Sequence, residues 1–202
     1  KLFAGSHYRG VFSTTNNGVN WEQEDYTDVG VHSYLNLGNN LYVGTFPASV
    51  YLSTNNGDSW TSVSDDMTSM VDIYNVHSLA ESGGNIYAGT GNNGVYKSTD
   101  NGNNWSQSGL VGHQVFAVAT NNNTIFAGVY SSGLPEAGLH ISTNGGASWI
   151  QKLSGFSVLS IGRIRYRGWY MHRAQGTRFS MVLGGKTHLV VSGHGRRSPT
   201  HH

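Results

Sequence analysis

Two histidines in a repeated Val-His-Ser stretch are the first residues whose type and spacing could do chemistry. His32 and His77 hold equivalent positions, and imidazole nitrogens from neighbouring repeats could share a metal ion. The same position holds Phe116 and Leu159 later in the chain, which favours apolar packing over metal binding. The other histidines of the repeats show no ligand spacing: His7, His113 and His140. We therefore predict no metal and no cofactor.

Carboxylates are the second candidates, because hydrolysis of a glycoside generally uses two of them facing a cleft. Asp65 and Asp66 are adjacent, but they lie in a polar turn and are expected to be a solvated loop. No nucleophile-elbow Ser and no phosphate-binding glycine loop is present, and the chain has no cysteine. We predict no catalytic residue among the acids considered: Glu22, Glu24, Asp25, Asp28, Asp65, Asp66, Asp72, Glu81 and Glu136.

A repeat of about 42 residues must position these side chains. Four segments align without gaps and end at tryptophans spaced by 39, 45 and 44 residues: Gly10–Trp21, Ser49–Trp60, Gly94–Trp105 and Gly138–Trp149. Each unit has three short apolar runs, and a fourth begins at the tryptophan. We name them A (Val-His-Ser type), B (Ile-Tyr-Ala-Gly type), C (Gly-Val-Tyr type) and D. Four such strands predict one antiparallel blade of an all-β propeller.

The turn between runs C and D is predicted to be structural. Ser or Thr followed by Asn or Asp can bond nearby backbone amides, and the glycine suits a positive φ. The large tryptophan can then cover the hairpin and anchor strand D. The residues concerned are Asn16, Gly18, Trp21, Asn55, Gly57, Trp60, Asp100, Gly102, Trp105, Asn144, Gly146 and Trp149.

The pattern [ST]-T-[ND]-x-G-x-x-W resembles the Asp box, or BNR repeat, of sialidases, xyloglucanases, photosystem II assembly factors and non-catalytic secreted bacterial propellers. The resemblance implies a β-propeller with four clear blades and a degenerate fifth, or a part of a larger ring. It also implies that the boxes lie away from any active site. The sialidase arginine cluster has no counterpart, because Arg9 is the one arginine before residue 161. A fragment of a sialidase-like or xyloglucanase-like hydrolase remains the alternative.

The B–C loops are the most variable part of the repeat, and specificity usually resides in variable loops on a constant scaffold. Aromatic and amide side chains there suit a glycan or a protein ligand. The predicted ligand-binding residues are His7, Tyr8, Arg9, Phe46, Asn92, Asn93 and Tyr130. We therefore expect a non-catalytic scaffold or recognition module.

The last forty residues differ from the repeats. Residues 1–160 carry eleven acids and four Lys or Arg, whereas residues 161–202 carry eight Lys or Arg and no acid. Three interpretations stay open for 161–202: a degenerate fifth blade, a shifted reading frame or artificial tail, and a basic arm. Without a nucleic-acid-binding fold, we expect no nucleic-acid partner.

The start of the chain and its polarity bear on location. Lys1 falls in a strand-like pattern, so we expect a mature or truncated start and an extracellular or cell-envelope protein. No apolar run has the roughly 18 residues that a membrane span needs. If the ring is unclosed, exposed strand edges would favour self-association.

Overall fold

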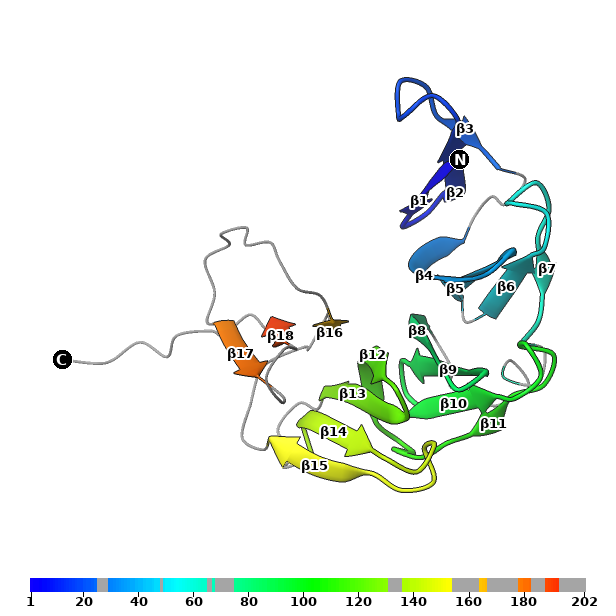
Figure 1. The fold of residues 1–202 in the computed structure, drawn as a ribbon. Coiled ribbons are helices and arrows are strands. Elements are labelled where there is room, and N and C mark those ends of the chain that lie inside the picture. Colours follow the sequence, from blue (N-terminus) through cyan, green and yellow to red (C-terminus); the bar gives the residue numbers. More distant parts are fainter. Residues whose placement is uncertain are drawn as a thin grey trace.

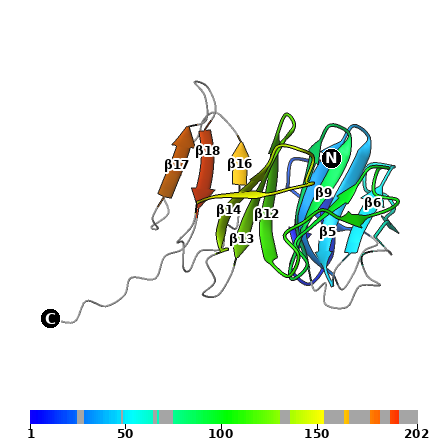
Figure 2. The same ribbon diagram turned by 90° about the horizontal axis from the view of Figure 1, so that it is seen from below.

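The computed structural model describes residues 1–24, 29–47, 49–64, 67, 75–130 and 136–153, together with the backbone of three later strands. All of its regular elements are β-strands. Consecutive antiparallel sheets follow one another along an arc, and the predicted A strands lie on its inner side (Figure 1). In a second view the long strands of neighbouring sheets run side by side (Figure 2). No helix among the described residues has the length and apolar character needed to cross a bilayer.

The first sheet has three strands and begins with run B, as the sequence predicts. Its order is β1-β2-β3, with β1 pairing only with β2 among the described strands. The side of β1 that faces the inside of the arc therefore forms a sheet edge. The strands are β1 (Leu2–Ser6), β2 (Gly10–Thr14) and β3 (Glu22–Gln23).

Three complete four-stranded sheets follow, each a meander in the order A-B-C-D. The D strands are short and start one residue after the closing tryptophan. The second sheet contains β4 (Gly30–Leu37), β5 (Asn40–Phe46), β6 (Ser49–Ser53) and β7 (Thr61–Ser62). The third contains β8 (Val76–Ser82), β9 (Asn85–Thr90), β10 (Val95–Ser98) and β11 (Ser106–Gln107). The fourth contains β12 (Gln114–Asn121), β13 (Thr124–Tyr130), β14 (Gly138–Ser142) and β15 (Ile150–Leu153).

Three further strands lie in the divergent ending: β16 (Ile164–Tyr166), β17 (Arg178–Val182) and β18 (His188–Ser192). They pair in the order β16-β18-β17, which departs from the consecutive order of the other sheets. Residues 183–187 between β17 and β18 lie outside the described residues, as does Leu159.

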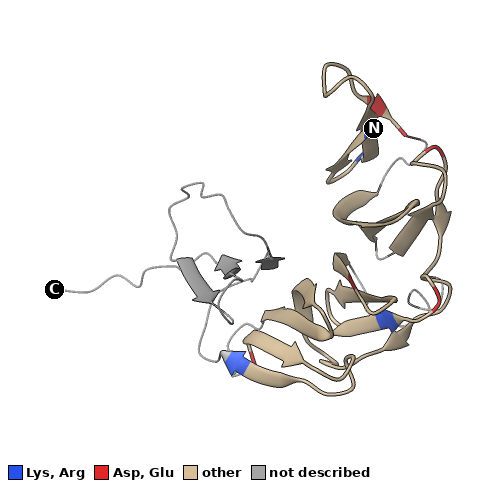
Figure 3. Cartoon of the chain, viewed as in Figure 1, with Lys and Arg blue, Asp and Glu red and all other residues tan. Residues whose placement is uncertain are grey.

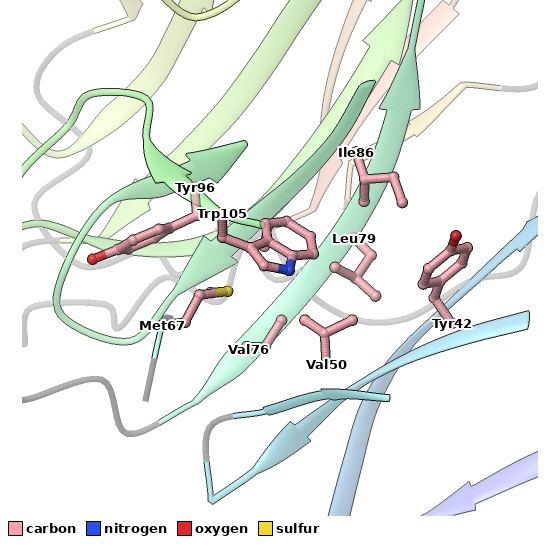
Figure 4. Close-up of a cluster of buried hydrophobic side chains, with 9 residues drawn as sticks. Tyr42, Val50, Met67, Val76, Leu79, Ile86, Tyr96 and Trp105 are labelled. Carbon is pink, nitrogen blue, oxygen red and sulfur yellow. The ribbon is translucent and has the colours of Figure 1, made fainter. Parts of the chain in front are cut away.

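The core lies between sheets, because apolar residues occupy both faces of strands A and B. Between the second and third sheets, nine buried side chains form one cluster (Figure 4): Tyr42, Val50, Met67, Val76, Leu79, Ile86, Ala88, Tyr96 and Trp105. An equivalent cluster around Tyr87, Val115 and Ile125 joins the third sheet to the fourth. Each sheet is therefore stabilised by its neighbours.

A glycine near the end of the B strand allows this close approach. A Cβ on Gly44 would lie 2.7 Å from Val76 Cγ1, and one on Gly89 would lie 2.8 Å from the Val115 carbonyl oxygen. Gly5 has the same relation to Val31. The repeated Gly in run B is therefore needed because the next sheet's A strand packs directly on it.

Within each C–D turn, one hydroxyl and one Asn or Asp side chain hold the backbone. In the third sheet, the Gly102 amide donates to Ser98 Oγ at 2.8 Å and the Asn104 amide donates to Asp100 Oδ1 at 2.9 Å. Thr14 with Asn16, Ser53 with Asn55 and Ser142 with Asn144 repeat the arrangement. The glycines Gly18, Gly57, Gly102 and Gly146 have φ between 86° and 90°, as the sequence predicts.

The same turns also bind the preceding sheet. The Trp105 indole N–H donates to the Val63 carbonyl at 2.7 Å, and that of Trp149 donates to the Ser108 carbonyl at 2.7 Å. In return, the Tyr42 hydroxyl donates to the Asn101 carbonyl at 3.0 Å. The C–D turns of the third and fourth sheets therefore also act as clips between neighbouring sheets, whereas the buried Trp60 Nε1 of the second sheet has no hydrogen-bond partner among the described residues.

Replacing Trp105 by Phe tests this clip. The change removes the indole donor and leaves the carbonyl of half-buried Val63 without it, so we expect a loss of about 2 kcal/mol in the free energy of unfolding. Trp21 is the matched control, because it is 44% exposed whereas Trp105 is 6% exposed. Urea unfolding should show a clearly lower midpoint for Trp105→Phe and almost no change of midpoint for Trp21→Phe. Equal midpoints would contradict the role of the clip.

Candidate ligand-binding rim

A β-bulge near the start of each A strand turns one side chain out of the regular alternation. The strand register shifts between Val31 and Ser33, between Val76 and Ser78, and between Val115 and Ala117. The extra residues are His32, His77 and Phe116. Because a bulge re-aims its side chain, these three rings come from equivalent places on three neighbouring sheets.

The three rings continue into a row of five aromatic side chains across four sheets. Ring centroids are 5.5 Å apart for His7 and His32, 5.4 Å for His32 and His77, and 4.4 Å for His77 and Phe116. Tyr130 ends the row, with its ring perpendicular to Phe116 at 5.6 Å. We call these five side chains the ring row.

The ring row lies at the end of the sheets where the B–C loops and the D–A connections meet, here called the B–C rim. His7 belongs to the loop between β1 and β2, and Tyr130 ends β13. Adjacent A strands are fixed there by Ser78, whose Oγ accepts from the Val118 amide at 3.0 Å and donates to the Val118 carbonyl at 3.2 Å. The A–B and C–D turns lie at the opposite end.

Two histidines of the row, His32 and His77, have lowered pKa values. Burial, followed by the charge of His7, lowers the pKa of His32 below its ordinary value. Burial, followed by the charge of His32, lowers the pKa of His77 from 6.5 to about 4. Within the row, only His77 and Phe116 are stacked face to face, while the other neighbouring rings are tilted or perpendicular.

Free ring faces are found beside the row. Tyr8 is 71% exposed and its ring stands edge-on against His7, with centroids 4.3 Å apart. Phe46, at the end of β5, is 40% exposed. Tyr8 and Phe46 are therefore the two predicted ligand-binding aromatics with an accessible face.

The predicted polar residues occupy the same rim. Arg9 is exposed, and its carbonyl accepts from Gln23 Nε2 at 3.0 Å. Asn92 and Asn93 are half-buried. The Asn92 side chain accepts from Gln114 at 3.5 Å, while the Asn93 amide donates to Thr90 Oγ1 at 3.1 Å. All seven residues singled out in the sequence thus lie at the B–C rim.

Charged groups are few among the described residues, and the acids are dispersed (Figure 3). Asp58 and Asp100 lie in C–D turns and Glu81 ends β8, all at the opposite end from the B–C rim. Glu22 and Glu24 lie on or just after the outer strand β3. Of the described acids, Glu136 alone lies in a B–C loop. The candidates Asp25, Asp28, Asp65, Asp66 and Asp72 lie outside the described residues.

The remaining histidines take separate positions. His140 is buried on β14, and a ring nitrogen of His113 lies 2.9 Å from the Val111 carbonyl. The sequence places His32 and His77 in equivalent positions, but it gives no sign that His7 and Tyr130 extend their row. All three bulges have the same length, so the repeat length does not reveal them. The recurring Val-x-Ser/Ala stretch is the one signal in the sequence that marks the bulge.

The stacked four-stranded sheets and their inner rim define a β-propeller. Residues 24–188 match the DUF6242 beta propeller domain, and the chain belongs to that family. No curated protein matches the sequence.

Solved structures share the fold at low sequence identity. The GH74 xyloglucanase from Xanthomonas campestris is 19% identical with a TM-score of 0.60, over 75% of this chain and 28% of that one. YCF48 bound to D1 peptide is 16% identical with a TM-score of 0.55, over 73% and 50%. PorZ, a surface component of the type-IX secretion system of Porphyromonas gingivalis, is 9% identical with a TM-score of 0.52, over 74% and 25%. The chain therefore spans half or less of each of these structures.

The lowered histidine pKa values predict a pH-dependent stability. An unfolded chain binds a proton at His77 near pH 6.5, whereas the folded chain does so only near pH 4. The unfolded state thus holds more protons between these values, so this contribution is complete above about pH 6.5 and is lost as the pH falls towards 4. Replacing His77 by Phe, the residue at the same place in the fourth sheet, should reduce the slope of unfolding free energy between pH 7 and pH 5.

Urea unfolding at several pH values measures that slope. His113→Gln is the control, because His113 lies outside the ring row. It should keep the slope of the unsubstituted protein. Identical slopes for His77→Phe and the unsubstituted protein would show that His77 titrates normally in the folded state.

Proposed function

We propose that this propeller is a non-catalytic, extracytoplasmic recognition module that binds a protein or glycan ligand at the B–C rim. The observation that carries the proposal is the pair of exposed aromatic side chains, Tyr8 and Phe46, beside the ring row. Tyr8 lies in the loop between β1 and β2 and Phe46 ends β5, and the scaffold beneath them contains buried inter-sheet clusters. Rigid exposed aromatics are typical anchors for a ligand, because little side-chain entropy is lost when they bind.

Two proteins of similar fold are in keeping with a binding role. YCF48 has been solved with a bound D1 peptide, and PorZ is a bacterial surface component. Their low identity to this chain carries the fold only. The chemistry of this rim, with aromatic faces, amides and one exposed arginine, is our reason to extend recognition to this chain.

The alternative is that the chain is a piece of a glycoside hydrolase, which the similarity to the xyloglucanase keeps in view. Two carboxylates would then have to face each other across a cleft. Among the described residues, Glu136 is the single acid in a B–C loop, which does not provide such a pair. Hydrolysis of fluorogenic glycosides that a single carboxylate substitution abolishes would establish the enzyme and contradict the binding-only proposal.

Glycan and peptide arrays probed with the purified protein test recognition. For any ligand found, we expect Tyr8→Ala and Phe46→Ala each to weaken binding at least about tenfold, or about 1.4 kcal/mol. Val19→Ala is the matched control, since Val19 is 77% exposed but lies in a C–D turn at the other end. Equal losses for all three variants, or none for the two rim variants, would place binding elsewhere.

A further inference from the structure

The His32 and His77 side chains face each other through the same ring nitrogen. Their Nδ1 atoms are 3.4 Å apart, within reach of a long N–H···N hydrogen bond whose donor depends on the tautomer. The sequence alone favoured apolar packing at this position, as in Phe116. The facing nitrogens are a feature that apolar packing does not explain.

The same separation also suits a metal ion bound between the two nitrogens. Zinc binds imidazole nitrogen at about 2.0–2.1 Å, and two such ligands at the tetrahedral angle of about 109° are about 3.3–3.4 Å apart. The Nδ1 separation of 3.4 Å agrees with that value. Both rings are half-buried, so solvent can still reach the pair.

We propose that His32 and His77 form a two-histidine site for a late first-row divalent cation, with Zn²⁺ as the reference ion. Imidazole suits Zn²⁺, Ni²⁺ and Cu²⁺ better than hard cations. No group of three or more His, Cys, Asp or Glu able to hold a metal occurs among the described residues. The pair therefore supplies two ligands and leaves the remaining positions to water or to an oxygen of a rim ligand.

The location gives the ion a structural effect. His32 belongs to β4 of the second sheet and His77 to β8 of the third. A metal held by both side chains cross-links two sheets that are 45 residues apart in sequence. Because binding to the folded state alone stabilises it, metal should raise the melting temperature.

Titration of the full chain with ZnCl₂ at pH 7.5, followed by calorimetry, tests the site. The double variant His32→Phe/His77→Phe copies the ring found at Phe116, and His113→Gln is the matched control. We expect the double variant to bind one zinc ion fewer per chain than the unsubstituted protein. Its melting temperature should also rise less when zinc is added. The control should match the unsubstituted protein in both respects. Histidines of the divergent ending are present in all three proteins, so their binding cancels in the comparison.

Long-range ¹H–¹⁵N NMR of the unsubstituted protein gives a second readout that needs no variant. Zinc should shift the Nδ1 resonances of His32 and His77 together, as one zinc ion binds to the pair. Unchanged Nδ1 resonances at saturating zinc, or equal zinc stoichiometry in the double variant and the control, would overturn the proposal. The outcome is separate from ligand recognition, because the arrays depend on Tyr8 and Phe46.

Discussion

From the second sheet to the fourth, the hydrogen bond from an indole N–H to a carbonyl of the preceding sheet is the interaction on which the sheet arrangement depends. Trp105 bonds to Val63 and Trp149 to Ser108, while Tyr42 and Tyr87 donate back to carbonyls of the next C–D turn. These bonds are directional, whereas the apolar clusters between the sheets are not. They fix how far and at what angle the third and fourth sheets follow the sheet before, and the close approach at Gly44 and Gly89 requires that spacing.

The B–C rim depends on this spacing although it lies at the other end of the sheets. Ring centroids 5.4 Å apart for His32 and His77 and 4.4 Å apart for His77 and Phe116 require that the A strands of these three sheets stay close together. Bulges then place one ring from each strand in the row. The structural turns and the recognition loops are therefore separated in space, so the loops can vary without altering the clips. Such a division suits a repeat fold whose specificity lies in its loops.

Much of this fold could be predicted from the sequence, because each sheet repeats the same local signals. The positive φ at Gly18, Gly57, Gly102 and Gly146 and the A-B-C-D order follow from the repeated motif. The partner of each tryptophan could not be predicted, since Val63 and Ser108 lie in the preceding repeat and share no side-chain type. The facing nitrogens of His32 and His77 depend on the bulge and on inter-sheet distance, which composition and spacing do not encode. The strand order β16-β18-β17 has no counterpart in the repeats.

Hydrogen exchange of the indole N–H groups, followed residue by residue by NMR, tests the role of the clips most directly. Trp105 and Trp149 donate to carbonyls of the preceding sheet, while Trp21 is exposed. We predict exchange at Trp105 and Trp149 that is slower than at Trp21 by orders of magnitude and that requires separation of the sheets. Exchange at Trp105 as fast as at Trp21 would contradict the account, because the sheets would then be held together without the clips.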